Sequence, residues 1–312
     1  MDVKSKLLLK KKCAWDGIKG KQEKEVFDFS SEYKKFMDAS KTEREAVIFI
    51  ENMSLKHGFK RINSASKNET KLIISNKGVS TALCVVNDRS FKNGFNIIVA
   101  HIDAPRLDLK PITLYESEHM AYMKTHYYGG IKKYQWVTVP LALHGIIVKS
   151  DGKKINVCIG EEEGDPVFTV NDLLVHLAQE QVSKPASKVI EGEQLNILVG
   201  SIPYKFKSGS EAVKTGILEF LNKKYGINEE DLVSAELQVV PAGKARDIGF
   251  DRSFIGGYGQ DDRVCAYTAL RAIFDAGKCK QNLLALFLDK EEVGSTGTGG
   301  ADSNLLIRVA SQ

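Results

Sequence analysis

The stretch LLALFLDKEEVGS, residues 283–295, decides how the rest of the chain is organised. Its apolar half is short and ends abruptly in charged residues and glycine, which is typical of a buried β-strand. Such a strand would present Glu291 and Glu292 at its carboxyl end. Two adjacent carboxylates repel each other and lose solvation unless a cation or a proton lies between them. The pair therefore predicts a metal site, with a solvated turn after a strand as the alternative.

A second apolar run, FNIIVA at residues 95–100, is followed by His101 and Asp103. Later in the chain, the glycine-rich segment FIGGYGQDDR leads into a predicted helix and places Asp261 near its start. Strands that alternate with helices at both ends of the chain indicate an α/β sheet. Ligands of such sheets bind outside the carboxyl ends of the strands. We therefore expect His101, Asp261 and the glutamate pair to meet at one rim of the sheet.

The residue types expected at this rim suit a metal centre that activates water. His101 can bind an ion through one ring nitrogen while Asp103 accepts a hydrogen bond from the other. The two oxygens of Asp261 can bridge two cations, and one glutamate can bind metal while its neighbour acts as general base. Each feature alone is weak, because an Asp-Asp pair before a helix is often only a cap. Together, and in this order, they favour a two-metal hydrolase.

The middle of the chain has a different pattern. From about residue 105 to residue 241 the segments are rich in turns and often alternate between apolar and polar residues, as in HGIIVKSDGKKINVCIG at residues 144–160. Two predicted helices, at residues 171–181 and 210–225, interrupt this pattern. We interpret residues 105–241 as a β-rich domain inserted into another domain.

The surrounding parts of the chain, residues 1–104 and 242–312, are predicted to form one α/β domain. In the first part we expect a helix at residues 41–58, because Thr42 and Glu45 match a capping box.

Composition argues against several functional classes. The net charge is only +4, and the lysines are spread along the chain without interleaved aromatic residues, so we expect no nucleic-acid binding. No apolar run approaches the roughly 20 residues that span a bilayer, so we expect no membrane insertion. The five cysteines are scattered and odd in number, which favours a reducing, cytoplasmic setting.

Four motifs extend the argument: AHIDAPRLDLKP (100–111), YYGGIKKYQWV (127–137), VPAGKARDIGFDRSFIGGYGQDDRVCAY (240–267) and DKEEVGSTG (289–297). Together they resemble the aspartyl aminopeptidase family of cocatalytic zinc metallopeptidases, in its bacterial form. The resemblance covers nearly the whole chain. It implies an α/β fold, with a phosphorylase/hydrolase-like zinc-peptidase sheet that carries helices on both faces, plus an inserted β-rich dimerisation domain.

The resemblance also implies roles for individual residues. His101, Asp261 and Glu292 would be zinc ligands, with Asp261 bridging two ions. Glu291 would be the general base, and Asp103 would orient His101. Manganese or cobalt would also suit such mixed imidazole and carboxylate ligation.

A further histidine, His176 in the segment DLLVHLA at residues 172–178, matches a family position whose histidine reaches into the active site of a neighbouring subunit. A histidine on a helix surface is the alternative interpretation. Members of the family assemble as tetrahedral dodecamers, so the resemblance implies self-association through dimers.

One departure from the family matters for function. Family members draw two more ligands, an Asp and a His, from beyond the position of Gln312, whereas the only acid after Glu292 here is Asp302 and no histidine follows His176. We therefore expect a truncated form that holds part of a dinuclear site. The implied activity is hydrolysis of N-terminal residues from peptides. A metal-dependent deacylase or amidohydrolase, and a catalytically silent assembly subunit, are the alternatives.

Overall fold

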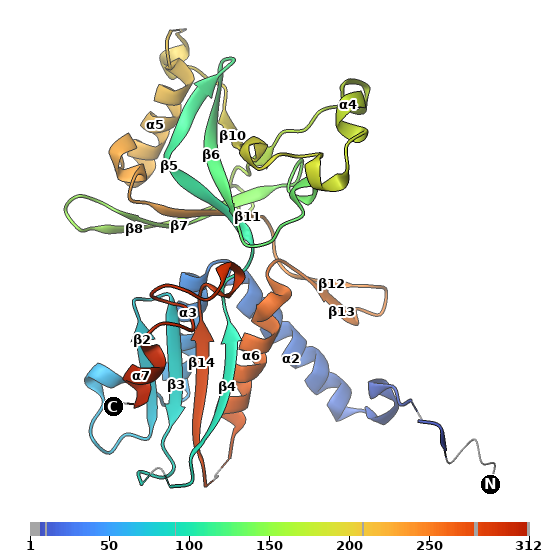
Figure 1. The fold of residues 1–312 in the computed structure, drawn as a ribbon, viewed down its shortest axis with the longest axis vertical. Coiled ribbons are helices and arrows are strands. Elements are labelled where there is room, and N and C mark those ends of the chain that lie inside the picture. The colour runs from blue at the N-terminus through green and yellow to red at the C-terminus, as the bar shows by residue number, and fades with distance from the viewer. Residues whose placement is uncertain (1–6, 10, 91, 208, 278–279, 311–312) are drawn as a thin grey trace.

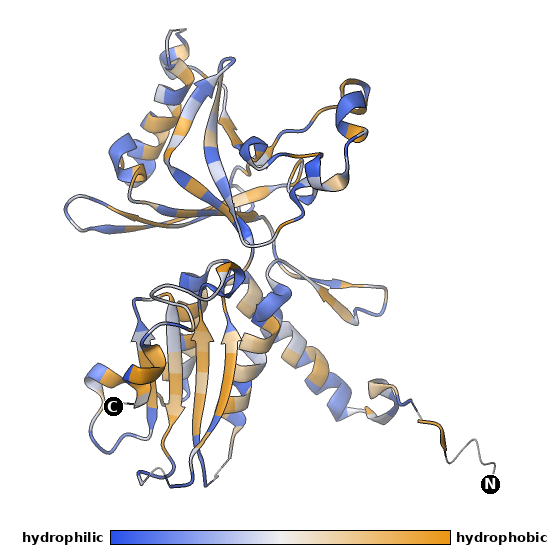
Figure 2. Cartoon of the chain, viewed as in Figure 1, coloured by the Kyte–Doolittle hydropathy of each residue, from blue (hydrophilic) through white to orange (hydrophobic). Residues whose placement is uncertain are grey.

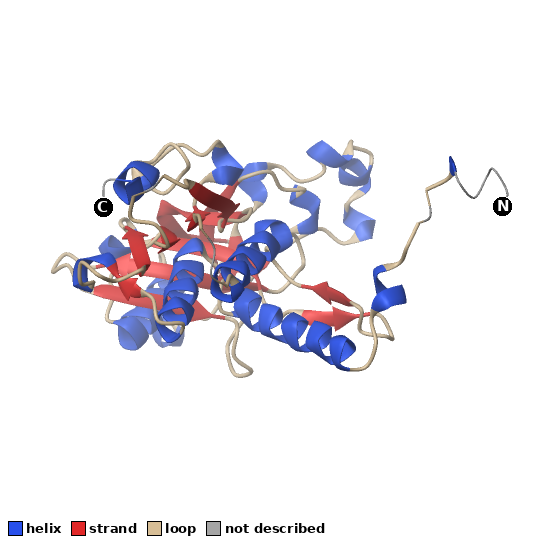
Figure 3. Ribbon diagram, turned by 90° about the horizontal axis from the view of Figure 1, so that it is seen from below, coloured by secondary structure: helices blue, strands red, loops and turns tan. Residues whose placement is uncertain are grey.

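The structure is a computed structural model that describes residues 7–9, 11–90, 92–207, 209–277 and 280–310. Two bodies, each built on its own β-sheet, lie one above the other along the long axis of the molecule (Figure 1). The first body has a five-stranded sheet and the second a seven-stranded sheet. Seen from below, helices lie in a layer beside the strands, and the first described residues extend away from both bodies (Figure 3).

The five-stranded sheet is mixed, in the order β1-β2-β3-β14-β4. Strand β14 runs antiparallel to β3 and parallel to β4, so the parallel rim expected from the sequence is formed by two neighbouring strands only. Strands β4 and β14 are coloured mainly as hydrophobic in Figure 2, which fits the apolar runs of the sequence. The five strands are β1 (Lys60–Arg61), β2 (Lys71–Asn76), β3 (Ser80–Val85), β4 (Phe95–His101) and β14 (Asn282–Leu288).

Helices cover both faces of this sheet, as the resemblance implied. On one face, Phe36, Ile50 and Leu270 pack with Phe287 of β14 in one buried cluster. On the other face, Leu305 joins a smaller cluster with the alternate residues of the same strands. The helices are α2 (Lys21–Asp38), α3 (Glu43–Lys56) and α6 (Gln260–Asp275) on the first face, and α7 (Leu305–Ala310) on the second.

Helix α3 begins where the capping box predicted it. The backbone N–H of Glu45 donates to the Thr42 hydroxyl at 3.2 Å, and the N–H of Thr42 donates to the Glu45 carboxylate at 2.9 Å. This pair satisfies two N–H groups that a helix terminus otherwise leaves without partners.

The seven-stranded sheet has the order β8-β7-β11-β5-β6-β10-β9, and every pairing recorded among its described strands is antiparallel. Helix α5 (Ala212–Tyr225), which was predicted at residues 210–225, packs Val213 and Leu221 into the core of this body. The strand bounds are β5 (Arg106–Ser117), β6 (Met120–Tyr128), β7 (Leu141–Val148), β8 (Lys154–Ile159), β9 (Thr169–Val170), β10 (Ile197–Gly200) and β11 (Glu236–Pro241).

The prediction of a helix at residues 171–181 is wrong. The segment contains only a 3-10 turn, η4 (Val175–Leu177), and one short helix, α4 (Gln179–Val182). The leucines and valines that suggested a helical face are exposed, with Leu174 at 71% and Leu177 at 72%. An amphipathic helix gains most of its stability by burying an apolar face, and here that face is uncovered.

The remaining elements are short. A hairpin of β12 (Arg246–Ile248) and β13 (Phe254–Gly256) projects beside α2 (Figure 1). None of the helices found in the described parts of the chain has the length and hydrophobicity that a membrane crossing requires. The other 3-10 turns are η1 (Ala14–Gly17), η2 (Ile62–Ser64), η3 (Lys133–Gln135), η5 (Ala186–Lys188), η6 (Gly192–Gln194), η7 (Tyr204–Phe206), η8 (Glu229–Leu232) and η9 (Glu291–Val293).

Candidate metal centre

The parallel pairing of β4 with β14 brings the histidine and the glutamate pair to the same rim. Leu288, the last residue of β14, pairs with His101, the last residue of β4. The pairing continues one step further, because the N–H of Ile102 donates to the Leu288 carbonyl at 2.8 Å. The segments that follow β4 and β14 then leave the sheet at the same edge. The expectation that these two strand ends converge is therefore confirmed.

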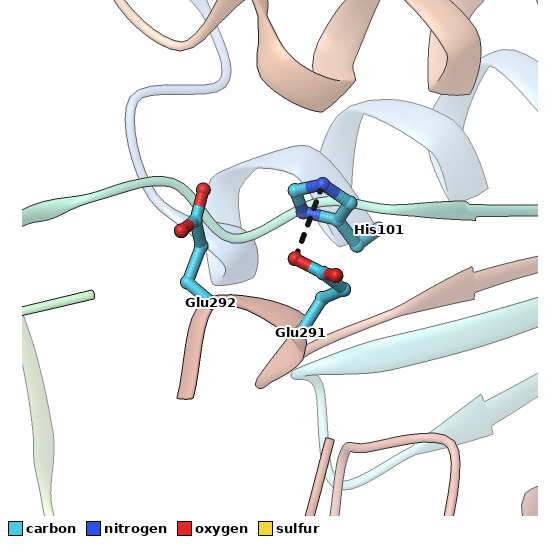
Figure 4. Close-up of side chains that lie close together, drawn as sticks. All are labelled: His101, Glu291 and Glu292. Carbon is cyan, nitrogen blue, oxygen red and sulfur yellow. Dashed lines mark ion pairs between the residues drawn. The ribbon is translucent and has the colours of Figure 1, made fainter. Parts of the chain in front are cut away.

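Three potential ligands lie together at this rim. His101, Glu291 and Glu292 each offer one ligand atom, and these atoms all lie within 4.8 Å of one another. A Glu291 carboxylate oxygen is 3.7 Å from Nε2 of His101. Figure 4 shows the Glu291 carboxylate directed at the imidazole, with the Glu292 side chain rising beside it from the same turn. The prediction placed these residues together, and the structure brings them together.

Asp261 reaches the same histidine from a different direction. It lies in the first turn of α6, and its Oδ1 is 3.2 Å from Nε2 of His101. The Asp261 side chain is 86% exposed, so its carboxylate has room to move toward a cation. Asp261 thus enters the site from the start of a helix and not from a sheet strand, and it adds a second carboxylate next to the nitrogen that would bind a metal.

Asp103 is the organising residue beneath the centre. Its carboxylate is fully buried, and Oδ1 lies 3.3 Å from Nδ1 of His101. The same carboxylate accepts the backbone N–H of Glu291 at 3.3 Å and that of Glu292 at 3.2 Å. Asp103 therefore holds the ring and the glutamate turn at once. The sequence pointed to the contact with the ring, whereas the contacts with the turn carried no sequence signal.

The turn itself has an unusual backbone. Lys290 precedes the glutamates with φ of +70°, a left-handed conformation that residues other than glycine adopt infrequently. Gly129, which also has φ of +70°, lies against the turn from the second body. A Cβ atom on Gly129 would stand 3.0 Å from Cβ and 3.2 Å from Oε2 of Glu292. The first glycine of the motif YYGG is thus a residue of the site, and no signal in the sequence indicated its contact with Glu292.

The electrostatics of the site favour a bound cation. Burial lowers the pKa of His101, but the hydrogen bond and charge of Asp103, with the charges of Asp262 and Glu291, outweigh burial and raise this pKa to about 9. Burial raises the pKa of Glu292, and the neighbouring carboxylates raise it further against the opposing effect of His101. In the absence of a metal, the protonated imidazole of His101 therefore offsets part of the surplus of carboxylates. A cation at this position would take over that role and release this proton.

The donor set fits zinc. One imidazole and two carboxylates, whose ligand atoms lie within 4.8 Å of one another, are groups of the kind that catalytic zinc sites use. The buried Asp103 on the far ring nitrogen matches the carboxylate–histidine–metal arrangement that orients ligands in such sites.

His176 lies apart from these residues within one chain. It belongs to η4 in the second body, close to α4, whereas His101 ends β4 in the first body (Figure 1). Beside it is a cavity of about 710 Å³ that Asp172 and Gln181 also line. The structure of the single chain therefore does not bring His176 to the candidate metal centre.

Comparison with known proteins identifies the family. Residues 36–312 match the family described as "Aminopeptidase I zinc metalloprotease (M18)". The chain belongs to this family. A probable M18 family aminopeptidase 1 of Clostridium acetobutylicum is 52% identical over 303 residues, which are 95% of this chain and 65% of that protein.

Solved M18 structures share the fold. The M18 aminopeptidase of Thermotoga maritima superimposes with a TM-score of 0.92 at 44% identity, over 97% of this chain and 66% of that one. Aminopeptidase I of Clostridium acetobutylicum gives a TM-score of 0.89 at 49% identity, over 97% of this chain and 68% of that one. The chain thus spans about two thirds of the length of the M18 relatives that it matches.

Proposed function

We propose that this M18 chain acts in a zinc aminopeptidase that hydrolyses N-terminal residues from peptides. The observation that carries the proposal is the convergence of His101, Glu291 and Glu292, whose ligand atoms lie within 4.8 Å of one another at the rim of the sheet. The family match supports the same chemistry, because the family is described as a zinc metalloprotease.

Two ions form the complete centre in this proposal. His101, Asp261 and Glu292 would hold the ions, with Asp261 as the bridging ligand. Bound zinc would polarise the scissile carbonyl and lower the pKa of a water molecule. Manganese or cobalt would suit the same mixed ligands. Since each catalytic zinc usually takes about three protein ligands, a complete pair of ions needs ligands in addition to these three residues.

The two glutamates take different roles because their surroundings differ. Glu292 packs against Gly129, and a side chain confined in this way suits a ligand. The Glu291 side chain is 57% exposed and can reach water and substrate, which suits a general base. Glu291 would accept a proton from the attacking water and pass it to the amine of the departing peptide.

Self-association belongs to the same proposal. The segment around His176 exposes Leu174, Val175 and Leu177 on the second body, and we place a second copy of the chain against it. His176 would then contribute to the centre of that copy, and residues 105–241 would mediate dimers within a dodecamer. The S. cerevisiae mApe1 dodecamer shares this fold at 20% identity and a TM-score of 0.68. A cytoplasmic location is proposed from the scattered cysteines alone.

A catalytically silent assembly subunit is the second candidate. It is favoured by the small number of metal ligands that the described residues bring together, which is fewer than two zinc ions require. In that case the chain would fold and associate but would not turn over peptides.

The test compares zinc content with hydrolysis of aminoacyl anilides in the wild-type chain and in two variants. Glu291→Gln should keep bound zinc and lose turnover, because the amide cannot accept a proton. Glu292→Ala should lose zinc as well. Full turnover in Glu291→Gln would reject the assignment of the base, and a folded wild-type oligomer without zinc or turnover would favour the silent subunit.

A further inference from the structure

The second body contributes a hydrogen bond to the buried base of the candidate metal centre. Tyr128 ends β6 of the seven-stranded sheet, and its hydroxyl donates to Oδ2 of Asp103 at 2.7 Å. This is shorter than the bonds that Asp103 accepts from the backbone of Glu291 and Glu292. Asp103 is therefore held by a residue that lies 25 positions further along the chain, in the sheet of the second body.

We propose that Tyr128 is a positioning residue of the metal centre, which acts through Asp103 on His101 and on the glutamate turn. The proposal rests on the proposed function as far as zinc is concerned. The effect of Tyr128 on Asp103 and on the glutamate turn can be measured in the metal-free chain and does not depend on that function.

Tyr128 is itself fixed by a buried cation. The Arg106 guanidinium lies over the Tyr128 ring, with Cζ 3.8 Å from the ring centroid. The Arg106 side chain is 4% exposed, so its attraction to the ring is little screened by water. The Tyr128 residue is only 7% exposed. Neither side chain can rotate away without breaking these contacts.

Arg106 is in turn held by carboxylates from both bodies. Its Nε donates to Asp108 at 2.7 Å, and its Nη1 lies 3.4 Å from Glu43 in the first turn of α3. The Gln238 amide of β11 donates to both Glu43 oxygens, at 2.9 and 3.0 Å. A continuous series of buried contacts therefore joins the start of α3 and the second sheet to Asp103.

The Tyr128 hydroxyl has a specific effect on Asp103. A buried carboxylate needs donors for its oxygens, and without this hydroxyl Oδ2 would keep only the long bond from Glu292. Asp103 could then rotate, and the turn that carries both glutamates would lose its anchor. Residues that orient metal ligands in this indirect way change metal affinity or activity by about 10–100-fold when they are altered.

The neighbouring Tyr127 offers a matched control. It precedes Tyr128 on the same strand, so its side chain points to the opposite face, and it is 40% exposed. Its ring lies beside His126 and close to Gly192, away from Asp103. Phenylalanine at either position keeps the ring and removes one hydroxyl, which makes the two variants chemically equivalent.

The experiment compares Tyr128→Phe with Tyr127→Phe in two measurements. Hydrogen–deuterium exchange of the metal-free chain should accelerate at the amides of Glu291 and Glu292 in Tyr128→Phe only, with β7 and β8 unchanged. Zinc affinity, measured by chelator competition, should fall at least about 10-fold in the same variant. Unchanged exchange in Tyr128→Phe, or equal changes in both variants, would overturn the proposal.

The exchange measurement also separates the two proposals. If exchange accelerates as expected while the wild-type chain binds no zinc, Tyr128 positions the turn and the proposed function fails. If zinc binds equally to all three proteins and exchange is unchanged, the positioning role fails and the metal centre stands.

Discussion

The turn at residues 289–294 and the segment at residues 171–182 both carry predicted functional residues, but the chain supports them in opposite ways. The turn is held by the buried Asp103 carboxylate below and by Gly129 at its side. The segment exposes most of its apolar side chains, with Val175 at 71%. The comparison suggests that the metal centre is preorganised within one chain, whereas the region of His176 depends on a partner.

The largest effect is expected from Asp103→Ala. The substitution removes an acceptor for His101, Tyr128 and two backbone N–H groups, and loss of one member of a buried charged pair costs about 3–5 kcal/mol. Urea denaturation should report this decrease in the free energy of unfolding. Asp302→Ala, at an exposed position, should change the same quantity by less than about 0.5 kcal/mol. Equal losses in the two variants would contradict the organising role of Asp103.

A second test addresses the junction between the bodies, which also contains a buried histidine. His144 is 2% exposed, with Nδ1 2.9 Å from Glu45 of α3 and Nε2 3.1 Å from Glu161. Burial lowers the pKa of His144, but hydrogen bonds with Cys158, Glu161 and Glu45 outweigh burial and raise this pKa to about 11.

The sign of the resulting pH dependence follows from the raised pKa. Because the folded pKa lies above the unfolded value of 6.5, the stabilisation is fully present below pH 6.5 and is lost as pH rises toward 11. His144→Gln should therefore destabilise the chain by about 1–3 kcal/mol at neutral pH, since it removes the cation that lies between Glu45 and Glu161 and leaves Glu161 with Lys41 at 3.6 Å. The difference from wild type should shrink between pH 7 and pH 11. A constant difference over that range would show that His144 acts through packing alone.

Gly129→Ala should have a smaller, local effect. The added Cβ meets Glu292 at 3.0 Å, and the left-handed backbone at φ of +70° costs a non-glycine residue about 1–2 kcal/mol. Zinc affinity should fall, because the Glu292 side chain must move. The matched control is Gly130→Ala, where a Cβ has no neighbour within 4 Å and no positive φ is recorded. Similar zinc affinities for the two variants would show that Gly129 does not contribute to the metal centre.

The smallest effect on stability is expected in the exposed segment. Leu174→Ser should change the free energy of unfolding by less than about 0.5 kcal/mol, because the side chain is 71% exposed and already hydrated. The same variant should weaken self-association, as measured by sedimentation velocity. A large loss of stability without a change in association would show that the segment packs on its own chain, and would erase the contrast with the turn.

Local sequence patterns correctly predicted individual strands and the start of a helix. The apolar runs before His101 and Asp289 gave two strands, and the Thr42 capping box gave the start of α3. The prediction of a helix at residues 171–181 was wrong because, although apolar residues recur there at helical spacing, no surface of the single chain covers them. Sequence periodicity reports which residues share a face, and it does not report whether that face is buried.

The site was predictable where its residues follow the two parallel strands or, for Asp261, begin a helix after a glycine-rich segment. His101 and the glutamates share a rim because their strands are parallel neighbours. The contacts of Tyr128 and Gly129 depend on how the second body lies on the first, which no local pattern encodes. The assignments of the general base, the bridging ligand and the domain boundaries stay predictions.

We propose that His101 and the glutamate turn form a zinc centre. The most direct test is zinc K-edge X-ray absorption of the zinc-loaded wild-type chain and of His101→Ala at equal zinc occupancy. We predict an imidazole scattering contribution alongside carboxylate oxygens in the wild type, and its loss in His101→Ala together with weaker binding. An unchanged spectrum and unchanged affinity in His101→Ala would place zinc elsewhere and rule out His101 as a ligand.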